Sequence, residues 1–147
     1  MADSQQQGGE LLKFVVQHKK NPNVDDEAFF KWYKEELMPK VMRVIKKYNI
    51  VRYSIFYTPS HFRAPLQDEF HNKLDKPDWT VPEWDATTCY WVHSLDDLRA
   101  LQADPEWRAK INGMEEPWIA KELNISLGYE TIYYEDGVVK NTTVAED

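Results

Sequence analysis

The sequence contains few residues of the types that build disulfide, metal or phosphate-binding sites. Cys89 is the single cysteine, which excludes an internal disulfide bond and fits a reducing compartment. Glycine occurs five times, and no glycine-rich phosphate-binding loop is present. Spacings typical of metal ligands, such as Cys-x-x-Cys and His-x-x-x-His, are also missing. We therefore expect no metal and no cofactor.

Long apolar runs and basic clusters are absent as well. No run approaches the roughly 20 apolar residues that cross a membrane, and the polar start, MADSQQQGGE, lacks a signal-peptide core. Eighteen basic residues against 25 acidic ones give a net charge of −7, and basic residues cluster only as pairs such as Lys19-Lys20. We expect a soluble, cytoplasmic protein that binds neither nucleic acid nor membranes.

Aromatic residues are abundant: six Trp, eight Tyr and six Phe make up 14% of the 147 residues. A chain of this length forms one domain with a single core. The rings either fill that core or line a cavity or a subunit interface, and the sequence leaves both possibilities open.

The stretch from Phe14 to Thr58 reads as a strand–helix–strand unit. A first strand is expected at Leu11–His18, followed by the turn Asn21-Pro-Asn and a helix that Asn23 or Asp25 can cap. Apolar residues then recur at helical spacing as far as Tyr48. Pro39 lies inside this helix, so either the helix kinks there or a second helix starts at Pro39; we favour the kink, because the apolar stripe continues on both sides. The second strand is expected at Val51–Thr58, which is rich in β-branched and aromatic residues.

The second half repeats this order after a long connection. Residues 59–84 contain four prolines, and a connection of this length is typical of a lid or binding loop. A third strand is expected at Ala86–His93, followed by helical segments capped at Ser94 and Asp104. A further helical turn is expected at Glu115–Leu123 and a final strand at Asn124–Tyr134.

The β-α-β, β-α-β order predicts an α+β fold: a ferredoxin-like split βαβ with a four-stranded antiparallel sheet and helices on one face. The domain is expected at 11–135, between a disordered segment (1–10) and a tail (136–147). Because two helices cover only one face, we expect a homodimer whose sheets close face to face. We also expect the first and third strands to run parallel, which places His18 and His93 at one end of the sheet and His61 at the other.

Two segments resemble the EthD family of the dimeric α/β-barrel superfamily. The first is HKKNPNVDDEAFFKWYKEELMPKV and the second is WDATTCYWVHSLDDLRALQADPEWRAKI. The resemblance extends over about residues 11–135 and is strongest to fungal polyketide-pathway proteins such as the atrochrysone carboxylic acid decarboxylases. It implies a homodimeric, cofactor-independent enzyme that acts on a bulky polyketide-like molecule.

The sequence departs from the family pattern at the position of one expected acid–base residue. The histidine that usually lies two residues before the helix proline is Leu37 here. The catalytic His and Tyr of a plant polyketide cyclase of this fold match Trp107 and Leu101, so that mechanism does not transfer. The resemblance implies a lyase, either a decarboxylase or a dehydratase. A cyclase or isomerase and a non-catalytic metabolite-binding protein remain the alternatives.

Three residues are the candidates for catalysis. His61 lies in a cluster with Thr58 and Arg63, and Asp85 follows Trp84, where a desolvated carboxyl would serve as acid or base. Tyr53 would hydrogen-bond a developing oxyanion. A structural histidine and a strand-end cap are the competing interpretations of His61 and Asp85. The expected substrate-binding residues are Arg63, Tyr33, Tyr57, Tyr90, Trp91, His93 and Phe29.

Overall fold

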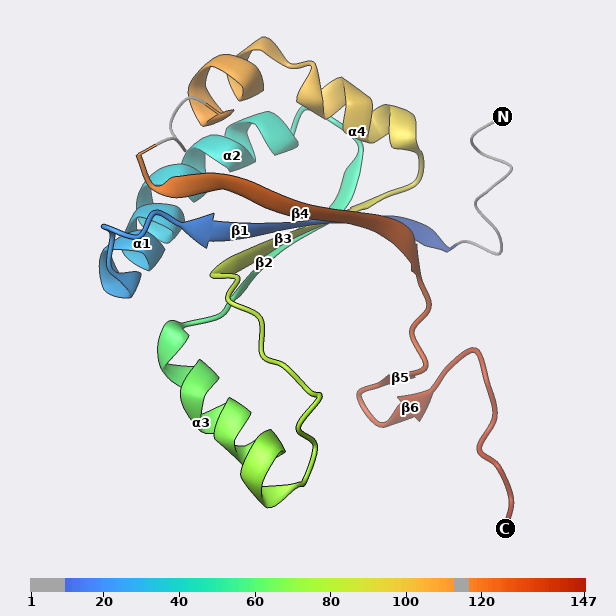
Figure 1. Ribbon diagram of the computed structural model, residues 1–147. Helices are drawn as coiled ribbons and strands as arrows, with labels where there is room; N and C mark the ends of the chain where they lie inside the picture. The colour runs from blue at the N-terminus through green and yellow to red at the C-terminus, as the bar shows by residue number, and fades with distance from the viewer. Residues whose placement is uncertain (1–9, 113–116) are drawn as a thin grey trace.

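A four-stranded antiparallel sheet forms the centre of the computed structural model, which describes residues 10–112 and 117–147. The strand order is β2-β3-β1-β4, and every neighbouring pair is antiparallel. The helices α1, α2 and α4 lie on one face of this sheet (Figure 1). The predicted α+β ferredoxin-like fold is therefore confirmed. The strands are β1 (Leu11–Lys20), β2 (Ile50–Tyr57), β3 (Ala86–Val92) and β4 (Ile119–Glu130).

The first helical segment continues past Pro39, as the sequence predicts, but with a local change of pitch. It consists of α1 (Asp26–Trp32), a π-helical turn (Tyr33–Leu37) and α2 (Met38–Ile45). Oδ1 of Asp25 accepts a hydrogen bond from the Ala28 amide at 2.8 Å, which confirms the predicted cap. Pro39 falls in the first turn of α2, where its missing N–H costs little. The π turn therefore lets the chain pass a proline without a loop.

The second helical segment begins at the two predicted caps. Ser94 caps α4 (Leu95–Gln102) by accepting a hydrogen bond from the Asp96 amide at 3.2 Å. Oδ1 of Asp104 accepts hydrogen bonds from the Glu106 and Trp107 amides at 2.8 and 3.0 Å, just before a π-helical turn at Trp107–Ile111.

The last strand differs from its prediction. It starts at Ile119, so residues 119–123 are extended rather than helical. Positions 113–116 lie outside the described residues. Most of the segment expected to be disordered, residues 1–9, lies outside them as well. A small hairpin of β5 (Tyr134–Glu135) and β6 (Val138–Val139) follows β4. Gly137, with φ +79°, takes the left-handed conformation that its turn requires.

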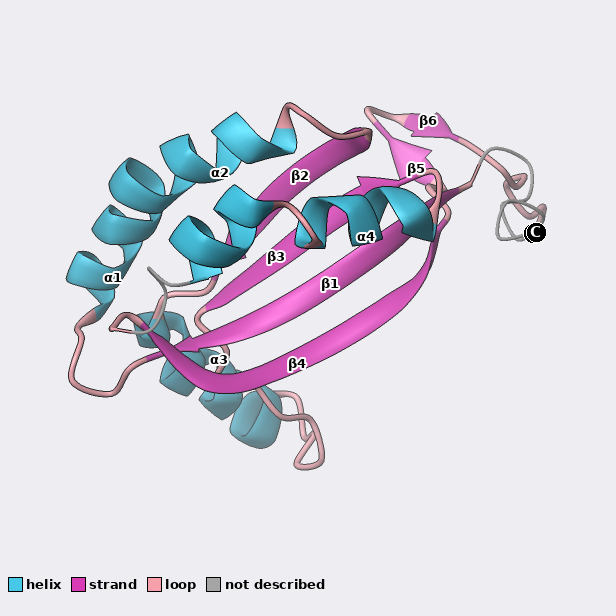
Figure 2. Cartoon of the chain, turned by 90° about the horizontal axis from the view of Figure 1, so that it is seen from above, coloured by secondary structure: helices cyan, strands magenta, loops and turns pink. Residues whose placement is uncertain are grey.

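The predicted strand directions were wrong. β1 and β3 are antiparallel, with His18 opposite Ala86, and β2 is antiparallel to β3 and so parallel to β1. The helical crossover between β1 and β2 returns the chain to the end where β1 began, and β3 fits between the two strands (Figure 2). Consequently β1 and β2 end beside the start of β3. His18 and His61 lie toward this end of the sheet, and His93 lies at the other end.

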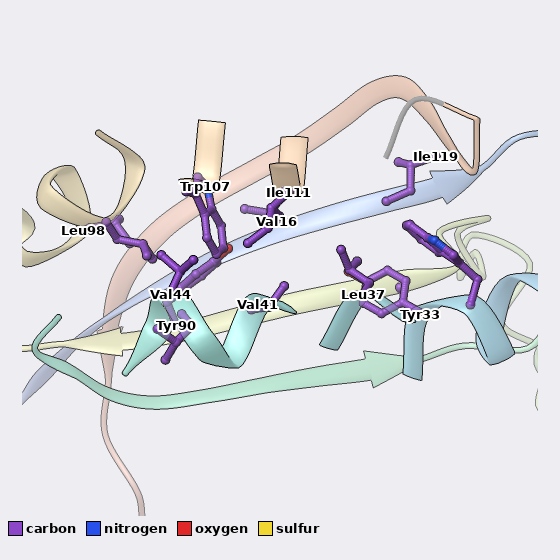
Figure 3. Close-up of a cluster of buried hydrophobic side chains, with 14 of the residues drawn as sticks. Val16, Tyr33, Leu37, Val41, Val44, Tyr90, Leu98, Trp107, Ile111 and Ile119 are labelled. Atoms are coloured by element: carbon purple, nitrogen blue, oxygen red, sulfur yellow. The ribbon is translucent and has the colours of Figure 1, made fainter. Parts of the chain in front are cut away.

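The hydrophobic core fills the space between the sheet and the helices. Side chains of α1, α2 and the 107–111 turn meet those of β1 and β3 there (Figure 3). The opposite face, here called the open face, is covered at one end by a helical segment and at the other by the β5–β6 hairpin (Figure 1). That segment contains Ser60–Phe62, α3 (Arg63–Asp68) and the π-helical turn Glu69–Lys73.

Candidate functional site

A cavity of about 760 Å³ lies between the open face and the connection at residues 59–84. This connection is called the lid segment below. Gln17, Phe56 and Thr87 of the sheet contribute to the cavity. Its lining is mainly apolar with a few polar groups, the usual character of a small-molecule site. The other lining residues are Tyr57, Thr58, Pro59, Phe62, Arg63, Pro65, Leu66, Glu69, Lys73, Val81, Pro82 and Trp84.

One side of the lid helix faces the sheet. Phe62, Leu66, Glu69 and Lys73 follow one another at three- and four-residue intervals, and all four line the cavity. Such spacing places side chains on one face of a helix. Sequence reasoning missed Glu69 and Lys73 as site residues, although this periodicity was the signal that would have revealed them.

Hydrogen bonds of Gln67 join the lid helix to the returning chain. Its Nε2 donates to the Trp79 carbonyl at 2.7 Å, and its Oε1 accepts from the Val81 amide at 2.8 Å. The rings of Phe70 and Trp79 pack edge to face with their centroids 5.2 Å apart. The lid segment is thus a structured unit rather than an irregular loop.

Hydrogen bonds hold the Arg63 side chain between the two ends of the lid segment. Its Nη2 donates to Oδ1 of Asp85 at 2.8 Å, to the Trp84 carbonyl at 2.9 Å and to the Thr58 carbonyl at 3.3 Å. Among the described residues, neither Nε nor Nη1 of Arg63 has a hydrogen-bond partner, and Nε is fully buried. Arg63 therefore keeps the two N–H donors of Nη1 for a ligand oxygen, because Nε is out of reach of a ligand and Nη2 is held in place.

Asp85 holds the Arg63 side chain in place. The residue is only 4% exposed, and its second oxygen accepts a hydrogen bond from the Lys20 amide at 2.8 Å. Both carboxylate oxygens are therefore bonded within the chain. Asp85 also does not line the cavity.

His61 lies in the first turn of the lid segment and is exposed. Its ring packs on Phe62 with centroids 4.3 Å apart, and Phe62 lines the cavity whereas His61 does not. The neighbouring Ser60 donates from its amide and hydroxyl to Oδ2 of Asp26, at 2.8 and 2.6 Å. Partial burial alone would raise the pKa of Asp26, but these two hydrogen bonds hold it below its usual value.

Four of the expected site residues lie on the helix face of the sheet, away from the cavity. Tyr53 and Tyr90 pack edge to face with centroids 5.0 Å apart. Phe29 is fully buried, and the Tyr33 hydroxyl lies 3.1 Å from Oγ1 of Thr88. The structure thus brings these four together in the core but not with Arg63.

The three remaining candidates lie in different places. Tyr57 packs against Phe30 on the helix side and also lines the cavity, and burial raises the pKa of its phenol. Trp91 lies on the open face at the other end of the sheet, where its Nε1 donates to Glu130 at 2.5 Å. His93 is exposed beyond the end of β3. Of the predicted set, Arg63 and Tyr57 therefore line this cavity, and Asp85 and His61 lie next to lining residues without lining it themselves.

No group of three or more His, Cys, Asp or Glu side chains among the described residues is arranged to hold a metal ion. In the same part of the chain, no helix has both the length and the apolarity to span a membrane.

Residues 21–122 match the family described as the EthD domain, which is most of the chain. The chain belongs to the EthD family. A protein of Pestalotiopsis fici named dehydratase iacD is 32% identical over 89% of this chain and 94% of its own length. A protein of Aspergillus terreus with the provisional name of oxygenase is 28% identical over 90% of this chain and 82% of its own.

Crystal structures show the same fold as this EthD protein. An EthD family protein of Bacillus halodurans superposes with a TM-score of 0.55 at 14% identity, covering 82% of this chain and 99% of its own. A protein of Pseudomonas aeruginosa gives 0.53 at 10% identity, covering 84% and 96%. At these identities the likeness concerns the fold alone.

Proposed function

We propose that this EthD protein is a cofactor-independent lyase of fungal secondary metabolism that removes water from an aromatic polyketide-type β-hydroxyketone. The observation that carries the proposal is an arginine with unused N–H donors in an apolar cavity of about 760 Å³. The relative named as a dehydratase supports water loss over the loss of carbon dioxide, the other lyase reaction considered.

The cavity suits a flat, fused-ring molecule. Phe56, Phe62 and Trp84 offer aromatic surface for the ring system, and Leu66 adds an aliphatic wall. Pocket volumes of roughly 300–1,000 Å³ are usual for ligands of this size. The proposed substrate is therefore held mainly by its apolar body.

Dehydration requires one proton to leave carbon and one to reach the departing hydroxyl. Removal of the proton beside the carbonyl creates an enolate oxygen, which the free donors of Arg63 stabilise. The enolate then expels hydroxide, which leaves as water once it is protonated, so no oxidant or reductant is consumed. Asp85 acts here as a positioning residue that fixes the guanidinium.

The proton-transfer groups are proposed from the lining and its rim. Glu69 lines the cavity, and its carboxylate has no ion pair or hydrogen bond within the described chain, so it is the proposed base. Tyr57, whose pKa is raised by burial, stays protonated and is proposed to hydrogen-bond a substrate oxygen. His61, at the start of the lid segment, remains the proposed acid. Tyr53 lies across the sheet and has no assigned step.

Mass spectrometry of a model reaction tests the reaction class. The purified protein is incubated, without added metal or cofactor, with 3-hydroxy-1-tetralone, which loses water to give 1-naphthol. We expect naphthol to appear faster than with the His61→Ala/Glu69→Gln double variant. A parallel incubation with 1-hydroxy-2-naphthoic acid reports the loss of carbon dioxide.

The other outcomes contradict dehydration in distinct ways. Carbon dioxide loss without water loss would establish a decarboxylase, and a product of unchanged mass would indicate a cyclase or isomerase. Oxygen uptake would indicate an oxygenase, the activity in the provisional name of the Aspergillus terreus relative. Saturable binding of both compounds without conversion would leave only a metabolite-binding protein.

A further inference from the structure

A second cavity, of about 770 Å³, lies under the β5–β6 hairpin at the opposite end of the open face. Its lining is separate from that of the first cavity: the two share no residue. Leu11, Val51 and Ile132 supply aliphatic walls, and Trp91 of β3 lies at its base. The other lining residues are Glu10, Arg52, Glu130, Thr131, Lys140 and Asn141.

The carboxylates around this cavity are already bonded. Glu130 accepts hydrogen bonds from Lys13 Nζ at 2.8 Å and from Trp91 Nε1 at 2.5 Å. The bond from Lys13 is the main cause that lowers the pKa of Glu130. Glu10 accepts a hydrogen bond from the Thr131 hydroxyl at 2.5 Å. These acids therefore orient their neighbours, and the positive charge of Arg52 also contributes to the lowered pKa of Glu130.

Arg52 is the cation at this cavity whose N–H donors remain unbonded within the described chain. Its guanidinium carbon lies 4.9 Å from the centre of the Trp91 ring. Nζ of Lys13, a residue of the neighbouring strand β1, lies 4.7 Å from the centre of the same ring. Arg52 has no ion pair or hydrogen bond with any other described residue. Because Glu130 holds the indole nitrogen, Trp91 is a fixed support that keeps the guanidinium plane in place over the cavity.

We propose that this second cavity binds a planar aromatic carboxylate, with Arg52 forming the charge-paired fork and Trp91 supporting it. A guanidinium fork matches the two oxygens of a carboxylate. The aliphatic walls formed by Leu11, Val51 and Ile132 favour an acid with an apolar ring system over a small inorganic anion. This site is independent of the reaction proposed for the first cavity.

Isothermal titration calorimetry with 2-naphthoate tests the proposal. All titrations use the Arg63→Gln background, which removes the cation of the first cavity, so that naphthoate held there by apolar contacts alone does not respond to changes at Arg52. We expect Arg63→Gln to bind one equivalent, and the addition of Arg52→Gln to weaken that binding by about tenfold or more, because a charge-assisted hydrogen-bond pair is lost. Arg52→Lys, which keeps the charge but not the fork, is expected to fall between the two.

Arg99→Gln in the same background is the matched control. Arg99 is an exposed arginine on α4 whose one ion-pair partner among the described residues is Asp96, so its removal changes the net charge equally and leaves the cavity untouched. Equal affinities for the Arg52 and Arg99 variants would overturn the proposal, as would the absence of naphthoate binding to Arg63→Gln. Neither result depends on whether the protein catalyses dehydration.

Discussion

His18 at the end of β1 is a buried base without a visible partner for one ring nitrogen. It is 7% exposed, and among the described residues its Nδ1 has no hydrogen-bond partner. Burial lowers the pKa of His18 from 6.5 to about 4, because the charged imidazolium would lose its hydration. The imidazole is therefore neutral in the folded protein at neutral pH.

This burial predicts a pH-dependent stability. Between pH 6.5 and 4 the unfolded chain binds a proton at His18 that the folded chain does not, so the free energy of unfolding falls as the pH falls through this window. The shift corresponds to roughly 3 kcal/mol. Urea unfolding at several pH values measures it. His18→Gln is expected to flatten the slope, whereas His93→Gln, at an exposed position, is expected to keep it. Equal slopes for both variants would contradict this account.

At the scale of elements, the lid segment is held at its ends and in its middle. Ser60 bonds to Asp26 of α1 at one end, and Arg63 bonds to Asp85 at the start of β3. In the middle, Gln67 links the helical part of the lid segment to the backbone of Trp79 and Val81. The cavity depends on these links because few of the lid side chains are buried.

Removal of the middle link should loosen the lid without loosening the sheet. Gln67→Ala deletes the acceptor of the Val81 amide, so we expect that amide to exchange hydrogen about fivefold faster, as the loss of about 1 kcal/mol implies. Hydrogen exchange followed by NMR measures this. Asn72→Ala, which breaks a bond to Asp68 within the same helix, is the control and should leave Val81 unchanged. Unchanged Val81 exchange in Gln67→Ala would show that the link is not needed.

The elements could be predicted from sequence where their signals are local. The caps at Asp25 and Asp104 depend on side chains only two or three residues from the amides they bind, and both were found. Strand direction depends on how the α1–α2 crossover packs, which no short stretch encodes, and it was predicted wrongly. To predict the cavity, one would have to know which face of the 62–73 helix meets the sheet. Tyr53 and Arg63 were grouped by chemistry, although the strand alternation and the lid place them on opposite faces.

At the scale of the whole molecule, an apolar stripe stays uncovered on the edge strand β4. Leu123, Ile125, Leu127 and Tyr129 are each 45–56% exposed. They pair in register with His18, Val16, Phe14 and Leu12, so they project on the helix side of the sheet. An apolar row on a free edge favours association with another chain.

The homodimer expected from the sequence stays a prediction. Its expected contact is on the open face, whereas this stripe on the helix side offers a different contact, so each is tested by its own variant. Light scattering should yield twice the 17.4 kDa of one chain. Ile125→Glu with Leu127→Glu should shift the mass toward the monomer, because two charges would be buried in the contact. Ser126→Glu, one residue away on the open face, tests the face-to-face contact instead, and a shift toward the monomer in this variant alone would place the contact there. A monomeric wild-type protein would contradict the prediction.

The rate of water loss from 3-hydroxy-1-tetralone in the Arg63→Gln variant tests the central claim most directly. If the free donors of Arg63 stabilise the enolate, kcat should fall roughly a hundredfold or more. Arg99→Gln should retain the wild-type rate, and circular dichroism should show both variants folded. Arg63→Lys, which keeps the charge but not the fork, should recover only part of the rate. Dehydration at the wild-type rate by a folded Arg63→Gln variant would show that the chemistry does not take place at this cavity.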